Sequence, residues 1–275
     1  MAVRTSADTA AAIGSTFLRR LPWDSNHFGF EVSEISSPTI GDENLAAALC
    51  FARESNHRLV YWTTEPGRNL PAWVARFGAT AVNHRVQYSM DMLSNHARSR
   101  DASVPDETFH VVTYPPGPAC RVLEELAILS GAYSRFHVDP RIPADRFESL
   151  YRIWVNRSTR RELADRVLVA TVASEIVVGF ITVSWRGSNG HVGLLAVHPA
   201  CQGRGIGSRL MKEAQDLLKA QSVKTVTVVT QLENVPACRL YSRWNYTPVE
   251  ISASFHFWPD PPARWPNPGM PGAQT

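Results

Sequence analysis

Three glycines between a strand and a helix constrain this chain more than any other feature. Residues 191–211 read HVGLLAVHPACQGRGIGSRLM, so an apolar strand leads into Gly203, Gly205 and Gly207 and then directly into a helical pattern. Glycines accept backbone angles that other residues resist, and they let a bulky ligand approach the main chain. The first N–H groups of a helix have no intrahelical partner and lie at the positive end of the helix dipole. The loop therefore predicts a pyrophosphate-binding site.

Two common pyrophosphate loops do not fit this segment. The chain has no G-x-x-x-x-G-K-[ST] string, and a G-x-G-x-x-G fingerprint would need glycine where Ser208 stands. The next expected strand, residues 224–231, also lacks the acidic residue that would bind a ribose. A third pattern, [QR]-x-x-G-x-[GA] after a strand ending V-x-P, does fit. The matching residues are Val197, Pro199, Gln202, Gly205 and Gly207. A tight strand-to-helix turn without a ligand is the alternative that the loop alone leaves open.

A second motif follows at a defined distance from the glycine loop. Residues 234–246 read NVPACRLYSRWNY, after a helical stretch and the strand-like KTVTVVT. They fit N-x-x-A-x-x-x-Y-x-x-x-G-[FY] except that Asn245 replaces the glycine, and Asn is the next-best residue for a left-handed helix cap. The matching residues are Asn234, Ala237, Tyr241 and Tyr246. With both motifs in this order, the chain resembles the GNAT superfamily of acetyl-CoA-dependent N-acetyltransferases.

The order of predicted elements agrees with this resemblance. Residues 108–258 read as a strand, two helices, three strands, a helix, a strand, a helix and further strands. We therefore expect an α/β (α+β) chain, with a GNAT fold built on a mixed central sheet and preceded by a smaller α/β N-terminal domain at 17–93. Residues 1–16 read as a flexible lead, 94–107 as a polar linker, and 259–275 as a disordered proline-rich tail.

Composition excludes several other classes of protein. The chain is 44% hydrophobic and 19% charged, which is typical of a globular protein. Its net charge of +3 comes from dispersed basic residues, which argues against a nucleic-acid partner. No apolar run approaches the roughly 18 residues of a membrane span, and the N-terminus lacks a secretory pattern. The four separated cysteines predict reduced thiols and no metal site, so we expect a cytoplasmic protein without a membrane partner.

Three short segments narrow the resemblance within the superfamily. LPWDSNHFG at 21–29, SRF at 134–136 and the stretch 153–157 resemble the TDP-fucosamine acetyltransferase group, whose members carry an extra N-terminal α/β domain. That group acetylates the 4-amino group of a TDP-linked 4-amino-4,6-dideoxyhexose, which implies a nucleotide-linked amino sugar as the acceptor. A nucleotide sugar brings negative charges and a flat base, so Arg135 and Phe136 are candidate substrate-binding residues. A surface arginine beside packed neighbours is the equal alternative for Arg135.

The resemblance also places acetyl-CoA, the expected co-substrate, along the strand and the glycine loop. The backbone of residues 194–197 would pair with the pantetheine arm as a sheet edge pairs with a strand. Asn234 would bind the same arm near the thioester, although a plain helix N-cap explains this residue equally well. The candidate acetyl-CoA-binding residues are Leu195, Ala196, Val197, Gln202, Gly203, Arg204, Gly205, Ile206, Gly207, Ser208 and Asn234.

Acetyl transfer to an amine needs a neutral amine and a proton for the departing thiolate. Tyr241 is the candidate general acid, although a phenol with a pKa of about 10 protonates a thiolate of about 8.5 at a cost of about 2 kcal/mol. A core role is the alternative, because Tyr241 shares an apolar helical face with Leu240 and Trp244. No carboxylate lies on the strand before the loop. His191 begins that strand and titrates in a suitable range. A half-exposed strand-end histidine without a catalytic role is the favoured alternative, and a water chain to solvent is the default base.

The sequence is compatible with other functions. The same chemistry could act on a peptide N-terminus, a polyamine, or an antibiotic or natural-product amino sugar. A non-catalytic acyl-CoA sensor is the alternative from another class, and the intact loop with Asn234 and Tyr241 argues against it. A homodimer formed by pairing of sheets is compatible with the pattern, but no residue decides it.

Overall fold

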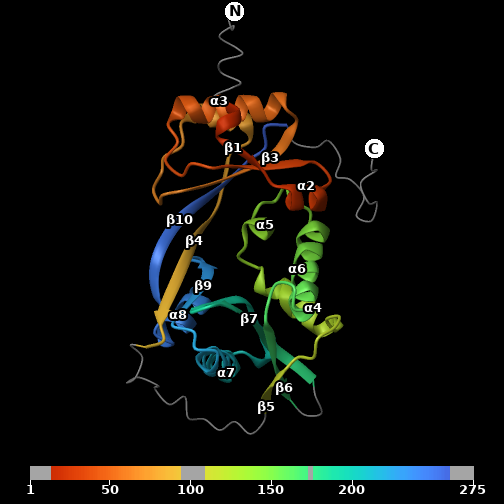
Figure 1. Cartoon of the computed structure of the whole chain (residues 1–275). Helices are drawn as coiled ribbons and strands as arrows, with labels where there is room; N and C mark the ends of the chain where they lie inside the picture. The colour runs from red at the N-terminus through yellow and green to blue at the C-terminus, as the bar shows by residue number, and fades with distance from the viewer. Residues whose placement is uncertain (1–13, 94–108, 173–175, 261–275) are drawn as a thin grey trace, which may run out of the picture. The chain divides into compact units, whose positions relative to one another are not determined.

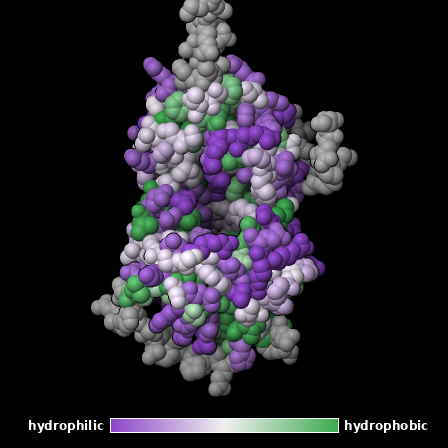
Figure 2. Space-filling view, viewed as in Figure 1, coloured by the Kyte–Doolittle hydropathy of each residue, from purple (hydrophilic) through white to green (hydrophobic). Residues whose placement is uncertain are grey.

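The computed structural model describes residues 14–93, 109–172 and 176–260. Strands and helices alternate along the chain as predicted, and the α/β class is confirmed (Figure 1). The predicted lead, linker and tail lie wholly or largely outside the described residues. Polar side chains cover most of the visible surface, with hydrophobic residues in scattered patches (Figure 2). Within the described residues, no helix combines the length and the hydropathy needed to cross a membrane.

The chain forms two compact units, and each is assembled from separate stretches of sequence. The first unit comprises Met1–His84, Val138–Arg146 and Ile251–Thr275, and the second comprises Arg85–His137 and Phe147–Glu250. This division cuts two long strands, β4 (Thr80–Asp91) and β10 (Thr247–Phe257), and two helices, α5 (Arg135–Val138) and α6 (Ala144–Thr159). The linker predicted at 94–107 lies outside the described residues, and the domain boundary expected there stays a prediction.

The first unit is a small sheet covered by helix α3. Its strands follow the order β1-β2-β3-β10, with β2 and β3 parallel and the other pairs antiparallel. Helix α2 begins at a proline and ends at Gly29, whose φ of 76° is left-handed. Gly78 is likewise left-handed and ends a 3-10 helix. The remaining elements are β1 (Leu18–Arg20), α2 (Pro22–Phe28), β2 (Glu31–Ile35), α3 (Asp42–Glu54), β3 (His57–Thr64) and η1 (Ala72–Phe77).

A buried carboxylate joins three stretches of the first unit. Asp139 is fully buried and accepts hydrogen bonds from His256 Nδ1 at 2.8 Å, Trp258 Nε1 at 2.9 Å and Arg141 Nε at 3.0 Å. The Arg141 guanidinium also donates to the Gly78 carbonyl at 2.5 Å. Burial by itself would raise the pKa of Asp139, but the hydrogen bonds from His256, Arg141 and Trp258 outweigh it and hold this pKa well below its usual range.

The second unit is a six-stranded mixed sheet that carries helices on both faces. Its strand order is β4-β9-β8-β7-β6-β5, and every pair is antiparallel except β8 and β9. The six strands are β5 (Phe109–Thr113), β6 (Arg166–Val172), β7 (Ile176–Arg186), β8 (Asn189–Val197), β9 (Thr225–Gln231) and the larger part of β4. The unit also includes the start of β10, most of α5 and α6, and the whole of α4 (Arg121–Ser130), η2 (Pro199–Cys201), α7 (Ile206–Ala220) and α8 (Val235–Arg243).

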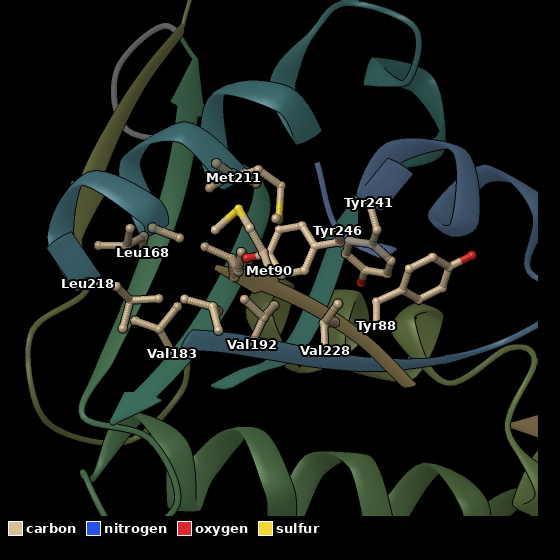
Figure 3. Close-up of a cluster of buried hydrophobic side chains, with 14 of the residues drawn as sticks. Tyr88, Met90, Leu168, Val183, Val192, Met211, Leu218, Val228, Tyr241 and Tyr246 are labelled. Atoms are coloured by element: carbon tan, nitrogen blue, oxygen red, sulfur yellow. The ribbon is translucent and has the colours of Figure 1, made fainter. Parts of the chain in front are cut away.

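Helix α7 covers one face of this sheet. Ile206, Leu210, Ala214 and Leu218 recur at helical spacing, and all four are buried. They pack with inward-facing valines of β7 to β9 and with two methionines (Figure 3). The rings of Tyr88, Tyr241 and Tyr246 lie together at one end of this cluster. The opposite face of β8 is contacted by α4.

Candidate active site

The site begins where two parallel strands part. β8 pairs with β9 from Asn189 to Val192. Beyond Val192, β8 continues along β7 to Val197, while β9 continues along β4 to Gln231. The two strands therefore diverge, and the edge of β8 that faced β9 becomes available to another extended group.

A bulge lies at the point of divergence. The register between β7 and β8 shifts so that Thr182 faces both Gly193 and Leu194. The Thr182 Oγ1 accepts a hydrogen bond from the Leu194 N–H at 2.8 Å. A Cβ atom at position 193 would lie 2.6 Å from this oxygen, which explains the glycine. Bulges turn a strand and redirect its neighbouring groups, and this one bends β8 beside the pocket.

A pocket of about 450 Å³ occupies the space beside the bulge, and all of its lining residues belong to the second unit. Strand β8 contributes His191 and Leu195, and helix α8 contributes Tyr241 with its capping residue Asn234. The lining also includes two aromatic and three hydroxyl side chains. These are Tyr151, Trp154, Ser130, Ser158 and Thr182.

The glycine loop ends in an open helix N-terminus. Gly203 and Gly205 have φ angles of 77° and 82°, and a Cβ atom added to either would meet nothing within 4 Å. Gly205 is the N-cap of α7 and provides no side-chain cap. The Gln202 side chain donates to the Val197 carbonyl at 3.1 Å and thereby ties the loop to the end of β8. The loop thus presents uncapped N–H groups beside open space, which suits a pyrophosphate.

Tyr241 belongs to the core and to the pocket at once. It is 4% exposed, yet it lines the pocket. Its ring centroid lies 5.9 Å from that of Tyr88 and 6.0 Å from that of Tyr246. Burial raises the pKa of Tyr241 above its ordinary value, so the phenol keeps its proton at neutral pH. The core position and the general-acid role that the sequence suggests for Tyr241 are therefore compatible.

The second motif is built around the ends of α8. Asn234 is its N-cap, and the side-chain Oδ1 accepts a hydrogen bond from the Ala237 N–H at 3.2 Å. Its ligand-binding role stays a prediction, although the residue also lines the pocket. After the helix, Asn245 has a φ of 63°, so the substitution of glycine by asparagine keeps the left-handed turn.

The predicted acceptor residues lie outside the lining of this pocket. Phe136 is 6% exposed and packs edge-on against Trp154, with centroids 6.1 Å apart, so it supports the wall rather than forming it. The Arg135 guanidinium lies 4.9 Å from the Phe136 ring centroid. Burial raises the pKa of Tyr151 to about 12, and the positive charge of Arg135 offsets part of this increase. Tyr151 and Trp154 do line the pocket, although their spacing in α6 also suits a helical core face, and spacing alone does not distinguish a core from a pocket wall.

The second unit combines diverging parallel strands, a bulge and an uncapped glycine loop. These features agree with the acetyltransferase fold implied by the two motifs. Residues 129–246 match the family model described as Acetyltransferase (GNAT) family. A GCN5-related N-acetyltransferase from Sphaerobacter thermophilus shares the fold, with a TM-score of 0.56 at 16% identity over 87% of this chain and 75% of that chain. Residues 129–246 are therefore similar to a GNAT acetyltransferase domain.

The names of two curated relatives refer to sugars or polysaccharides. The chain is 32% identical over 153 residues to the spore coat polysaccharide biosynthesis protein SpsD of Bacillus subtilis, covering 54% of this chain and 52% of that protein. It is 29% identical over 120 residues to the dTDP-fucosamine acetyltransferase of Escherichia coli, covering 43% of this chain and 50% of that protein. The matches thus span about half the length of each relative.

Proposed function

We propose that this protein is an acetyl-CoA-dependent N-acetyltransferase that acts on the primary amine of a nucleotide-linked amino sugar. The observation that carries the proposal is the pocket in the second unit, which brings the bent strand β8 and the Tyr241 side chain together. The resemblance to a dTDP-fucosamine acetyltransferase supports the sugar part of the proposal.

The residues of the second unit fit acetyl-CoA. The N–H groups from Gly203 to Ser208 would hold the pyrophosphate, because the loop is open and the helix N-terminus is uncapped. The backbone of β8 up to Val197 would pair with the pantetheine arm. When bound, acetyl-CoA supplies an acetyl thioester whose sulfur leaves as a thiolate.

Tyr241 would donate its phenolic proton to that sulfur. The raised pKa of Tyr241 makes it a weaker acid, but the same dry environment also disfavours an unprotonated thiolate. Both groups are less stable as anions when buried, so the cost of proton transfer stays modest. Tyr241 would then recover a proton from solvent after the products leave.

The aromatic and hydroxyl wall would receive the sugar. Pockets for small molecules combine apolar and aromatic surface with a few polar groups that fix orientation. Trp154 and Tyr151 provide flat rings for the apolar face of a deoxy sugar, while Ser130 and Ser158 provide hydroxyls for its polar edge. Arg135, close enough to influence Tyr151, would attract the diphosphate.

Thiol release from acetyl-CoA tests this function directly. The acceptors are TDP-4-amino-4,6-dideoxyhexose, the same sugar without the nucleotide, a polyamine and a short peptide. We expect fast release with the nucleotide sugar, and a raised KM for it in Trp154→Ala with the KM for acetyl-CoA unchanged. Release with the polyamine or the peptide alone would contradict the sugar assignment. Tight acetyl-CoA binding without release in any mixture would contradict the catalytic assignment.

A further inference from the structure

We propose that His191, held in one tautomer by Thr227, is the base that takes the proton from the acceptor amine. This inference rests on the proposed acetyl transfer and names a residue that the motifs leave unassigned. His191 lies on β8, two residues before the bulge at Gly193. Its side chain lines the same pocket as Tyr241.

The hydrogen bonds around Thr227 determine which imidazole nitrogen carries the proton. His191 and Thr227 are register partners across the parallel pair β8 and β9. The Thr227 hydroxyl lies 3.4 Å from the Gly190 carbonyl, to which it donates, and 3.2 Å from His191 Nδ1. With its proton directed at the carbonyl, the Thr227 oxygen accepts from an Nδ1–H group. The imidazole is thereby left with an unprotonated Nε2 atom, which is the form a base requires.

The charges around the pocket favour the neutral imidazole. Surrounding protein lowers the pKa of His191 by desolvation, and the positive charge of Arg85 on β4 lowers it further. Arg85 itself is paired with Glu250 of β10 at 3.3 Å. The titratable groups that α6 and α8 present to the pocket are Tyr151 and Tyr241, and burial keeps both uncharged. Both effects on His191, desolvation and the charge of Arg85, favour the neutral imidazole, which is the form that can accept a proton.

The complete transfer balances with these two residues. The amine nitrogen forms a bond to the acetyl carbon and gives one proton to His191 Nε2. The carbon–sulfur bond breaks, and the sulfur takes the proton of Tyr241. The imidazolium and the phenolate then return to their starting forms by proton exchange with solvent. No oxidant, metal or further reactant is needed.

The first arm of the test measures the tautomer and requires no acceptor. Long-range ¹H–¹⁵N spectra of ¹⁵N-histidine-labelled protein, compared with His191→Gln, assign the His191 signals. We expect a neutral Nδ1–H tautomer at neutral pH and a pKa below the ordinary histidine value of about 6.5. Thr227→Val should lose this tautomer preference, and Thr227→Ser should keep it. A protonated ring or an Nε2–H tautomer at neutral pH would overturn the proposal, whether or not an acceptor is known.

The second arm measures the pH dependence of kcat/KM with whichever amine of the acceptor panel turns over. His191→Gln should lower kcat by about 10²-fold and abolish the acidic limb of the profile, with little change in the KM for acetyl-CoA. Thr227→Val should displace the acidic limb, and Thr227→Ser should restore it. His110→Gln, at an exposed histidine of β5, should behave as wild type. A wild-type profile in His191→Gln would overturn this inference and leave the proposed function intact.

Discussion

At the scale of single residues, Tyr241 has a structural role in the core, and we propose a chemical role for it as the general acid. Its ring fills the end of the core beside Tyr88 and Tyr246, while the residue also lines the pocket. The motif spacing predicted the chemical role, and the apolar helical face predicted the structural one. Neither pattern alone could show that one side chain serves both, because that depends on where the pocket meets the core.

Tyr241→Phe separates these two roles. Phenylalanine keeps the ring and its packing, so the free energy of unfolding should change little. Loss of the proton donor should lower kcat by about 10²-fold or more. The measurement is thiol release at saturating substrates. Tyr246→Phe removes the hydroxyl of a buried neighbour and should leave kcat close to wild type. Full activity in Tyr241→Phe would exclude Tyr241 as the acid.

Gly193→Ala tests the bulge. The new Cβ would stand 2.6 Å from Thr182 Oγ1, so the hydroxyl that binds the Leu194 N–H must move. We expect a loss of about 1–3 kcal/mol in urea unfolding, together with a raised KM for acetyl-CoA. Gly207→Ala is the matched control, because its Cβ would meet side-chain atoms at 3.6 and 3.8 Å, an ordinary contact distance. Equal stability of the two variants would contradict this account of the bulge.

At the scale of elements, glycines and motif residues predicted the local structure well. The left-handed turn at Asn245 occurs where the second motif indicated it, and the helix predicted after the glycine loop is α7, which buries an apolar face. The pocket wall was harder to predict. Tyr151 and Trp154 occupy α6 at a spacing that suits a core, and only the divergence of β8 from β9 opens a cavity beside them.

Asn234 substitutions separate a helix cap from a ligand contact. Asp is also a strong N-cap, so Asn234→Asp should keep the unfolding free energy, but it replaces the amide N–H donors with a carboxylate. We expect the KM for acetyl-CoA to rise in this variant. Asn234→Ala should raise the same KM and also lose about 1 kcal/mol of stability. An unchanged KM in Asn234→Asp would show that the residue serves only as the cap seen at Ala237.

At the scale of the whole molecule, the chain enters and leaves each unit more than once. The first unit includes Val138–Arg146 and the residues from Ile251 onward as well as the N-terminal stretch. Such an exchange depends on contacts between residues distant in sequence, such as Asp139 with His256 and Trp258, which local periodicity does not encode.

Asp139→Ala should destabilise the first unit. It removes a fully buried acceptor from three donors, so we expect a loss of about 3 kcal/mol in urea unfolding. Asp42→Ala breaks a surface pair with Arg68 in the same unit and should cost no more than about 1 kcal/mol. Similar losses in both variants would contradict a special role for the buried carboxylate.

The same carboxylate predicts a pH dependence of stability. Its pKa in the folded protein lies below the unfolded value of about 3.9, so its contribution is fully present above that pH. The contribution is lost as the pH falls further towards the folded pKa. Wild type should therefore lose more unfolding free energy than Asp139→Ala between neutral pH and about pH 3. Equal losses of unfolding free energy in wild type and Asp139→Ala over this pH range would contradict the lowered pKa of Asp139.

The most direct test of the central claim is the identity of the reaction product. Purified protein is incubated with acetyl-CoA and TDP-4-amino-4,6-dideoxyhexose, and the sugar is analysed by mass spectrometry and NMR. We predict one added acetyl group on the sugar nitrogen, formed by wild type and strongly reduced with Tyr241→Phe. An unmodified sugar would contradict the account, as would acetylation on oxygen.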